Sequence, residues 1–441
     1  MVRICDARNM GWVGAVAILA AVLPLATVSA WAAEAWPVFR GPSYDGSSDA
    51  ANLPLTWSEE HNVVWKTPIS HRGWSTPVVM DGQIWLTTAT EDGREMFVYC
   101  VDLATGGVLH RARLFQNAEP EPLENAVNSY ASPTGALQPG RFFAHFGTYG
   151  TAAIDTETFE MVWQRRDLPC RHFRGPGSSV VLAEDRLILT MDGIDVQYVT
   201  ALDAQTGRTV WTTPRSTKWQ DIDAEGNVLR DGDYRKGYGT PILCQVNGQR
   251  QLASAGAMAA FGYKPDTGEE LWTVAFNGYN AASSPVFAAG LVIVNTSNPK
   301  PTLIAVDPAG RGDVTETHVA WRYDRGVPVM PSPVVVNDEL VIFVNNTGVA
   351  ACLDAATGEE LWKERIGGNY CASPLVAGGK VYFFDTQGES IVIAADREFR
   401  ILARNRLDDG FMASPAVVGD RTMLLRTRTH LYRIEKSESR P

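Results

Sequence analysis

The stretch Ala-Leu-Asp-Ala-Gln-Thr-Gly-Arg-Thr-Val-Trp at residues 201–211 recurs in altered form along most of the chain. Its pattern, D-x-x-T-G-x-x-x-W, is complete again between Asp354 and Trp362. Degenerate copies begin at Asp102, Asp155, Lys264, Asp307 and Asp396. Self-similarity of this kind is typical of repeat architectures, so the copies indicate one fold built from a repeated unit.

The chemistry of this unit is that of a tight turn between two strands. Asp and Thr side chains bond nearby backbone groups in such turns, and Gly allows a positive φ. The flanking segments alternate apolar and polar residues, which is typical of half-buried strands. We therefore predict a hairpin turn, with the Trp on the strand that leaves it and its ring packed between neighbouring sheets.

A second mark, a small residue followed by Pro, opens an apolar strand ahead of each unit. Seven copies are present: Thr76-Pro77, Ser132-Pro133, Thr240-Pro241, Ser284-Pro285, Ser332-Pro333, Ser373-Pro374 and Ser414-Pro415. Ser178-Ser179 takes the equivalent place in a unit that lacks the Pro. A repeat period of about 40–50 residues, with four strands per unit, is the signature of a β-propeller.

The eighth unit has only three strands before the chain ends, the last of them around residues 431–434. The segment at residues 62–66 resembles the strand that carries the repeated Trp, so it can supply the missing strand. Closure of this kind removes the exposed edges of a linear array. We predict an all-β protein, a single eight-bladed β-propeller with four-stranded blades, the last blade closed by the N-terminal strand. Two polar insertions, residues 115–125 and 213–235, are either functional or mobile loops.

The start of the chain has the features of a secretory signal. Arg3 and Arg8 precede an apolar stretch at residues 13–28, and residues 30–32 form an A-x-A-like cleavage site. A membrane anchor is the alternative, but the stretch is short for a span of roughly 20 apolar residues. We expect residues 1–32 to be a cleaved signal peptide, 33–436 the propeller and 437–441 a C-terminal tail. The mature protein would then be exported, periplasmic or extracellular, and not membrane-spanning.

Composition limits the partners and the redox chemistry. The 441 residues include 39 Lys and Arg against 50 Asp and Glu, a net charge of -11, and no basic run of five. Nucleic acid is therefore not an expected partner, because a binding face must neutralise phosphates. Five cysteines follow residue 32, scattered and without CxxC spacing, so we expect buried strand thiols rather than a disulfide scaffold. The absence of CxxCH excludes an attached c-type haem.

The D-x-x-T-G-x-x-x-W unit resembles the repeat of the pyrroloquinoline-quinone-like (BamB-like) β-propeller family, across about residues 36–436. The opening Trp-Pro-Val-Phe-Arg-Gly-Pro at residues 36–42 is similar to the start of exported bacterial members. The family includes periplasmic quinoprotein dehydrogenases and a non-enzymatic, eight-bladed scaffold for outer-membrane assembly. The resemblance is specific for fold and carries little information about function.

Within this family, the chain departs from the dehydrogenases. Those enzymes carry two adjacent cysteines, and they hold quinone and calcium with Glu, Asn and Asp; no Cys-Cys pair occurs here and those positions are not matched. The resemblance thus implies a non-enzymatic scaffold without a cofactor, a monomer that binds a protein or peptide partner. The alternative is a quinone (PQQ)- and calcium-dependent oxidoreductase of alcohols or sugars. A third interpretation is binding of a carbohydrate or another small ligand without chemistry.

Polar and aromatic residues gather just ahead of the small-Pro marks, where the innermost strands begin around one mouth of the central channel. These candidate binding residues are Arg72, Trp74, Asn128, Tyr130, Arg174, Lys236, Tyr238, Tyr279, Asn280, Asn369, Tyr370 and Phe411. Tyr, Trp and Arg dominate binding hot spots because they combine area with polar groups. The alternative is an ordinary propeller mouth, with solvated polar groups and packed aromatics.

Other chemistry-bearing residues favour structural roles. Asp192 and Asp195 lack the spacing of a calcium loop, so a hairpin turn is expected there. Cys170 and His172 lack the companion pair that zinc needs. No nucleophile elbow, phosphate loop or dinucleotide fingerprint occurs, so we predict no catalytic residue and no metal site.

Overall fold

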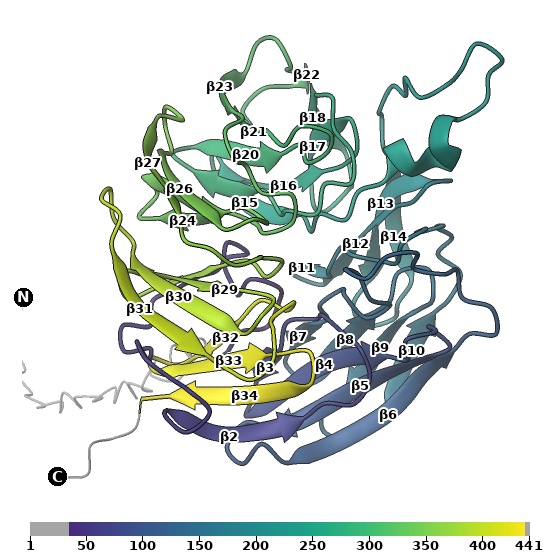
Figure 1. Cartoon of the computed structure of the whole chain (residues 1–441). Helices are drawn as coiled ribbons and strands as arrows, with labels where there is room; N and C mark the ends of the chain where they lie inside the picture. Colours follow the sequence, from purple (N-terminus) through teal and green to yellow (C-terminus); the bar gives the residue numbers. More distant parts are fainter. Residues whose placement is uncertain (1–34, 437–441) are drawn as a thin grey trace, which may run out of the picture.

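The computed structural model describes residues 35–436. The predicted signal peptide (residues 1–32), residues 33–34 of the predicted propeller and the predicted C-terminal tail (residues 437–441) lie outside the described residues. Eight sheets stand as blades in a ring, and each contains four antiparallel strands (Figure 1). The four strands are consecutive in the chain except in blade 5, which skips β22, and in blade 8, where the chain closes. This confirms the eight-bladed β-propeller. Within residues 35–436, no helix is long and apolar enough to cross a membrane.

The first four blades follow the chain from residue 78 to residue 275, and each runs from the innermost to the outermost strand. Blade 1 has β3 (Val78–Met80), β4 (Gln83–Ala89), β5 (Glu95–Asp102) and β6 (Val108–Gln116). Blade 2 has β7 (Ala136–Gln138), β8 (Arg141–His145), β9 (Thr151–Asp155) and β10 (Met161–Arg165). Blade 3 has β11 (Val181–Ala183), β12 (Arg186–Asp192), β13 (Gln197–Asp203) and β14 (Thr209–Pro214). Blade 4 has β15 (Ile242–Val246), β16 (Gln249–Ala255), β17 (Ala259–Tyr263) and β18 (Glu270–Ala275), and the 3-10 helix η1 (Leu229–Arg235) lies in the insertion before it.

The remaining blades complete the ring. Blade 5 has β19 (Val286–Ala288), β20 (Leu291–Asn295), β21 (Leu303–Val306) and β23 (Val319–Tyr323), while β22 (Gly312–Asp313) pairs in parallel with β18 of blade 4. Blade 6 has β24 (Val334–Val336), β25 (Leu340–Val344), β26 (Val349–Asp354) and β27 (Glu360–Arg365). Blade 7 has β28 (Leu375–Ala377), β29 (Lys380–Phe384), β30 (Glu389–Ala394) and β31 (Ile401–Arg406). Blade 8 has β32 (Ala416–Val418), β33 (Thr422–Arg426) and β34 (His430–Glu435).

The N-terminal strand closes blade 8, as predicted. β2 (Val63–Pro68) pairs antiparallel with β34, so the purple start and yellow end of the propeller lie side by side (Figure 1). Arg426 adds a second closure: its buried guanidinium donates to the carbonyl oxygens of Ser75 at 2.8 Å and Thr87 at 3.0 Å in blade 1. Burial lowers the pKa of Arg426 to about 9. The first and last blades are thus joined by both a strand and a buried side chain.

The repeated Trp and the repeated turn interlock neighbouring blades. Five indole N–H groups donate at 3.0–3.1 Å to a backbone carbonyl in the turn of the next blade: Trp65 to Leu103, Trp163 to Ala204, Trp211 to Pro265, Trp321 to Ala355 and Trp362 to Asp396. The turn Gly packs directly against that ring, since a Cβ on Gly207 would lie 2.7 Å from Trp163. This confirms that the repeated Trp packs between sheets.

The junction between blades 1 and 2 keeps a packed contact although both the repeated Trp and the repeated Gly are replaced. Its outer strand carries His110 in place of Trp, and the turn of blade 2 carries Phe159 in place of Gly. The two rings stack with centroids 4.7 Å apart and planes 2° apart. Phe159 keeps the positive φ of the turn at 61°. A stacked His–Phe pair therefore replaces the Trp–Gly contact at the junction between blades 1 and 2.

The small-Pro marks form a belt of hydrogen bonds around the axis. At six of the eight junctions, the backbone N–H of one mark donates at 2.9–3.0 Å to the hydroxyl of the next: Thr76 to Thr134, Thr134 to Ser179, Ser179 to Thr240, Ser284 to Ser332, Ser332 to Ser373 and Ser373 to Ser414. In blade 2 the belt residue is Thr134, so the prediction of Ser132 was wrong by two residues. The reason is that Thr134 lies two residues before β7, as the belt residues lie before the first strands of the other blades.

The N-terminal segment at residues 36–48 crosses one end of the ring. It bridges Val79 of blade 1 through Trp36, bonds Leu182 of blade 3 through the Tyr44 hydroxyl at 2.8 Å, and ends in β1 (Ser47–Ser48), which pairs with β28 of blade 7. Arg40, buried like the arginine of the closure, donates to the carbonyl of Pro333 before blade 6. The segment therefore contacts blades on opposite sides of the axis and covers this end of the channel.

The interlock predicts a graded effect of two glycine substitutions. Gly207 and Gly140 have nearly equal positive φ values, 70° and 74°, but only Gly207 faces a ring, since a Cβ on Gly140 meets nothing within 4 Å. Gly140→Ala should therefore cost about 1–2 kcal/mol of unfolding free energy from backbone strain alone. Gly207→Ala should cost at least about 1 kcal/mol more, because its methyl group displaces Trp163. Urea denaturation measures the free energy of unfolding of both variants. Equal losses would mean that Trp163 does not pack tightly against Gly207.

Candidate functional site

A cavity of about 410 Å³ lies at the centre of the ring. One residue from each blade lines it, always two places before the belt residue: Trp74, Ser132, Gly177, Tyr238, Ala282, Met330, Cys371 and Met412. Phe39 of the N-terminal segment also lines it and so forms its floor. The mouth is thus on the side away from that segment, where the loops that precede the first strands supply the lining residues.

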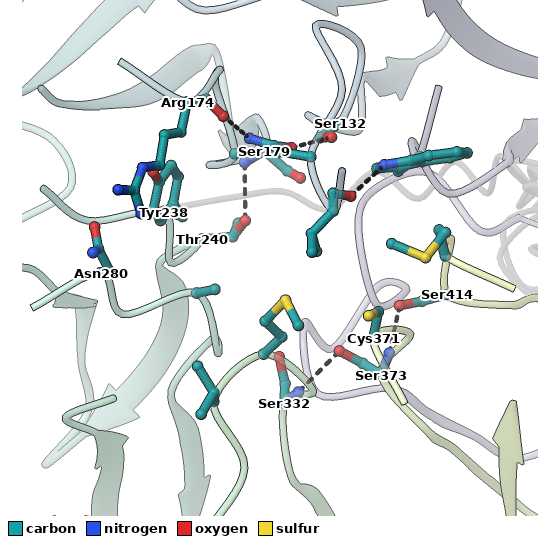
Figure 2. A pocket seen from close by; sticks show the side chains of 18 of the residues that line it. Ser132, Arg174, Ser179, Tyr238, Thr240, Asn280, Ser332, Cys371, Ser373 and Ser414 are labelled. Carbon is teal, nitrogen blue, oxygen red and sulfur yellow. Dashed lines mark hydrogen bonds between the residues drawn. The ribbon is translucent and has the colours of Figure 1, made fainter. Parts of the chain in front are cut away.

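Five of the twelve predicted residues line this cavity: Trp74, Asn128, Arg174, Tyr238 and Asn280. They come from the loops that precede the first strands of five neighbouring blades, 1 to 5. In Figure 2, Arg174, Tyr238 and Asn280 lie together on one side of the cavity, and Cys371 lies on the other. The geometry therefore brings the phenol of Tyr238, the guanidinium of Arg174 and the amide of Asn280 onto one wall.

Two further predicted residues contact side chains of the lining without lining the cavity themselves. Arg72 stacks 5.1 Å from the ring centroid of Trp74 and donates to the carbonyl of Ala126 at 2.5 Å. Lys236 is fully buried and donates a hydrogen bond to the Tyr238 hydroxyl. Burial lowers the pKa of Lys236 to about 8. These cations hold the cavity's two large aromatic side chains in place.

The other five predicted residues lie elsewhere. Tyr130, Tyr370 and Phe411 are buried among the blades and pack as core side chains. Tyr279 lines a second cavity of about 760 Å³, between blade 4 and the insertion that contains η1. Asn369 is exposed, and its carbonyl accepts a hydrogen bond from the N–H of Thr386 at 2.8 Å.

The sequence prediction missed three side chains of the opposite wall, Met330, Cys371 and Met412. It selected residues ahead of each mark by their polar or aromatic type, and in blades 7 and 8 this favoured Tyr370 and Phe411, one position too early. The signal that would have found all eight residues is positional. Each lies two residues before the belt residue, whatever its type.

Arg174 is held by a strained loop. Three successive residues have positive φ: Phe173 at 49°, Arg174 at 90° and Gly175 at 86°. The Asn128 amide fixes the loop by donating to the Arg174 carbonyl at 2.8 Å. Strain of this kind persists only where surrounding contacts enforce it, and it clusters at ligand sites. The loop therefore directs the Arg174 side chain to the cavity wall.

Asp192 and Asp195, the two acidic residues weighed against calcium, have separate partners. The Asp192 carboxylate forms a buried bidentate pair with Arg215, at 3.1 Å and 2.9 Å. Asp195 Oδ1 accepts from the backbone N–H groups of Arg171 and Val196, at 2.8 Å and 2.9 Å. Neither carboxylate is left free to share an ion with the other.

The sulfur and imidazole at residues 170 and 172 contact each other. Cys170 Sγ lies 3.6 Å from His172 Nδ1, and His172 Nε2 accepts from the backbone N–H of Thr148 at 3.0 Å. Burial lowers the pKa of His172 to about 3 and raises the pKa of Cys170. Within residues 35–436, no group of three His, Cys, Asp or Glu residues could hold a metal ion.

Cys371 provides a native reporter of the cavity. The five cysteines of the described chain are free thiols, and of these Cys371 alone is partly exposed, while Cys100, Cys170, Cys244 and Cys352 are buried. Four of the five thus match the expectation of buried thiols, although Cys170 lies in a loop. Burial raises the pKa of Cys371 to about 11, which Arg428 partly offsets.

We predict that Cys371 alkylation rises about tenfold per pH unit between pH 7 and pH 10, because only the thiolate reacts. The measurement is iodoacetamide incorporation by intact mass, with Cys371→Ser as the control. A rate that levels off below pH 9 would contradict the buried cavity environment of this thiol.

Comparison with known proteins agrees with this architecture. The sequence profile of the family described as "Outer membrane protein assembly factor BamB" matches residues 58–218 and 195–440. The chain belongs to this BamB family. The BamB of Moraxella catarrhalis has a similar solved structure, with a TM-score of 0.59 and 13% identity, covering 86% of this chain and 98% of that one. At that identity the likeness shows the fold.

Two curated relatives of this chain have different functions. The dehydrogenase subunit of the quinone alcohol dehydrogenase of Komagataeibacter europaeus is 28% identical over 205 residues, 43% of this chain and 25% of that protein. The BamB of Marinobacter adhaerens is 25% identical over 115 residues, 26% of this chain and 29% of that protein. The chain therefore spans only about a quarter of the length of each relative. Their functions differ, so the family alone does not choose between them.

Proposed function

We propose that this protein is an exported, non-enzymatic binding scaffold of the BamB kind, which holds a ligand or a segment of a protein partner in the mouth of the central cavity. The observation that supports this is the composition of the cavity wall. It combines Trp74, Tyr238 and Arg174, the side-chain types that dominate binding hot spots, with four asparagines and a belt of hydroxyls. A volume of about 410 Å³ is within the usual size range of small-molecule sites.

The alternative, a quinone dehydrogenase, needs carboxylates in the same place. Calcium takes six to eight oxygen ligands, commonly including Asp or Glu, and proton abstraction needs a base. Of the residues that line the cavity within 35–436, none is Asp or Glu. Asp233 is close to Arg174 at 3.8 Å, but it is buried and also faces Lys236 at 3.8 Å. The donor set therefore does not fit quinone with calcium, and we derive no step through that cofactor.

The test measures binding and turnover on the same samples. Alcohols, sugars, carboxylic acids and short peptides are each added to the whole protein, and both Cys371 alkylation and substrate-dependent dye reduction are followed. The proposal expects at least one class to slow alkylation at least threefold, with no dye reduction. Dye reduction would overturn it in favour of an enzyme. Unchanged alkylation with every class would also overturn it, because the cavity would then not be a binding site.

A further inference from the structure

The cavity wall is divided into two chemical halves. Because the blades follow one another around the ring, blades 6, 7, 8 and 1 form one continuous half, and they contribute Met330, Cys371, Met412 and Trp74. Each of these side chains is apolar or polarisable, and methionine adapts its shape to varied ligands. Phe39 adds a further apolar side chain to the lining of the cavity. This half therefore accommodates an apolar body.

The other half, from blades 2 to 5, is polar and carries positive charge. Arg174 reaches the cavity with 42% of its side chain exposed, and its nearest carboxylate oxygen, on Asp233, is 3.8 Å away. Asp233 also faces the Lys236 ammonium at 3.8 Å, so one carboxylate serves two cations. Both separations exceed hydrogen-bond distance. Two cations thus share one carboxylate, which leaves this part of the wall with a net positive charge.

Polar atoms on this half also lack partners. Within the described residues, Arg174 Nε and Asn280 Oδ1 are buried and form no hydrogen bond. Rotation of the Asn280 side-chain amide by 180° exchanges its acceptor Oδ1 and its donor Nδ2, so Asn280 can then offer its NH₂ group to a ligand oxygen beside Arg174. Figure 2 shows Arg174, Tyr238 and Asn280 on the same side of the cavity. Buried polar groups without partners are costly, and a ligand carboxylate oxygen would accept from Arg174 Nε and, after rotation of the amide, from Asn280 Nδ2.

We infer that the cavity binds an amphiphilic carboxylic acid, with its carboxylate on Arg174 and Asn280 and its apolar body against Met330, Met412 and Trp74. This inference rests on the proposed function and names the ligand class of that site. A guanidinium pairs with a carboxylate through charge-assisted hydrogen bonds, which are stronger than neutral ones. The lining has no carboxylate to repel such a ligand, although the whole chain carries a net charge of -11.

The same chemistry occurs in a free fatty acid and in the last residue of a polypeptide, so the test has two arms. Decanoate is compared with decanol, and the tripeptide acetyl-Leu-Leu-Phe with its C-terminal amide. Binding is measured by calorimetry and by protection of Cys371 from iodoacetamide. We expect one acid to bind at least tenfold more tightly than its neutral counterpart, and the arm that does so identifies the source.

Two arginine variants assign the anion site. Arg174→Gln should weaken binding of the acid at least tenfold and leave the neutral counterpart unchanged. Arg322→Gln, an exposed arginine on the outer strand of blade 5, removes the same charge far from the cavity and should leave both unchanged. Equal binding of acid and neutral compound, or full acid binding by Arg174→Gln, would overturn the inference while the proposed scaffold function stands. No binding of any compound, with Cys371 unprotected, would count against both.

Discussion

Replacement of Asp192 by asparagine is expected to lower the free energy of unfolding by about 3–5 kcal/mol, because it leaves a buried guanidinium without its counter-charge. The Asp192 and Arg215 side chains are 1% and 2% exposed, and they meet through two hydrogen bonds. Arg215 follows β14 of blade 3, but its guanidinium also donates to Ser254 Oγ at 2.8 Å and stacks 4.7 Å from the ring centroid of Phe261, so it is fixed against blade 4. Urea denaturation followed by circular dichroism measures the loss.

A double variant distinguishes the cost of leaving Arg215 buried without a counter-charge from the cost of losing the ion pair itself. Replacing a buried ion pair by apolar residues of similar size is often neutral or stabilising. Asp192→Leu combined with Arg215→Met should therefore be more stable than Asp192→Asn by at least about 2 kcal/mol. If the double variant is the less stable of the two, the pair itself stabilises the contact between blades 3 and 4, and our explanation by an unpaired charge is wrong.

Replacement of Trp211 by alanine is expected to cost about 3–5 kcal/mol, which is typical of a buried Trp. Trp211 is 9% exposed, donates to the Pro265 carbonyl at 3.0 Å, and packs on Gly268 in the turn of blade 4. Its removal therefore leaves a cavity at a junction between blades as well as an unpaired carbonyl. Calorimetric or urea unfolding, followed by circular dichroism, gives the change in stability.

Trp211→Phe is the matched variant, because it keeps a ring on Gly268 and removes the indole N–H. It should lower the free energy of unfolding by about 1 kcal/mol, the net value of one hydrogen bond, and by a further part of the packing energy, because the phenyl ring is smaller than the indole. A cost below 1 kcal/mol for Trp211→Ala would show that the repeated Trp does not hold neighbouring blades together.

The repeat made the fold predictable because each of its residues has one local task. Asp203 Oδ1 accepts from the Thr206 N–H at 2.8 Å and from the Thr206 hydroxyl at 2.7 Å, as the turn chemistry predicts. The closing strand was predictable for the same reason, since Trp65 bonds the turn of blade 1 as its counterparts do elsewhere. Arg426, by contrast, stabilises the closure through contacts with residues more than 300 positions away, which no local pattern records.

The candidate site was predictable only in part. Trp74, Arg174 and Tyr238 have the residue types that suggest binding, and they line the wall. Met330 and Met412 look like ordinary core residues in the sequence, and only the ring arrangement places them opposite Arg174. The error at Ser132 had a similar cause, because Pro133 marked the start of the strand two residues before the belt hydroxyl of Thr134. Spatial position around the axis, and not residue type, decides what faces the cavity.

The central claim, a binding cavity rather than a quinone enzyme, is tested most directly by titrating the purified protein with pyrroloquinoline quinone in the presence and absence of calcium. Calorimetry and dye reduction with mixed alcohols and sugars are followed together. Because the cavity lining has no carboxylate, we predict that calcium leaves any quinone binding unchanged and that no dye is reduced. Calcium-dependent, stoichiometric binding accompanied by turnover would contradict the scaffold and make the cavity an active site.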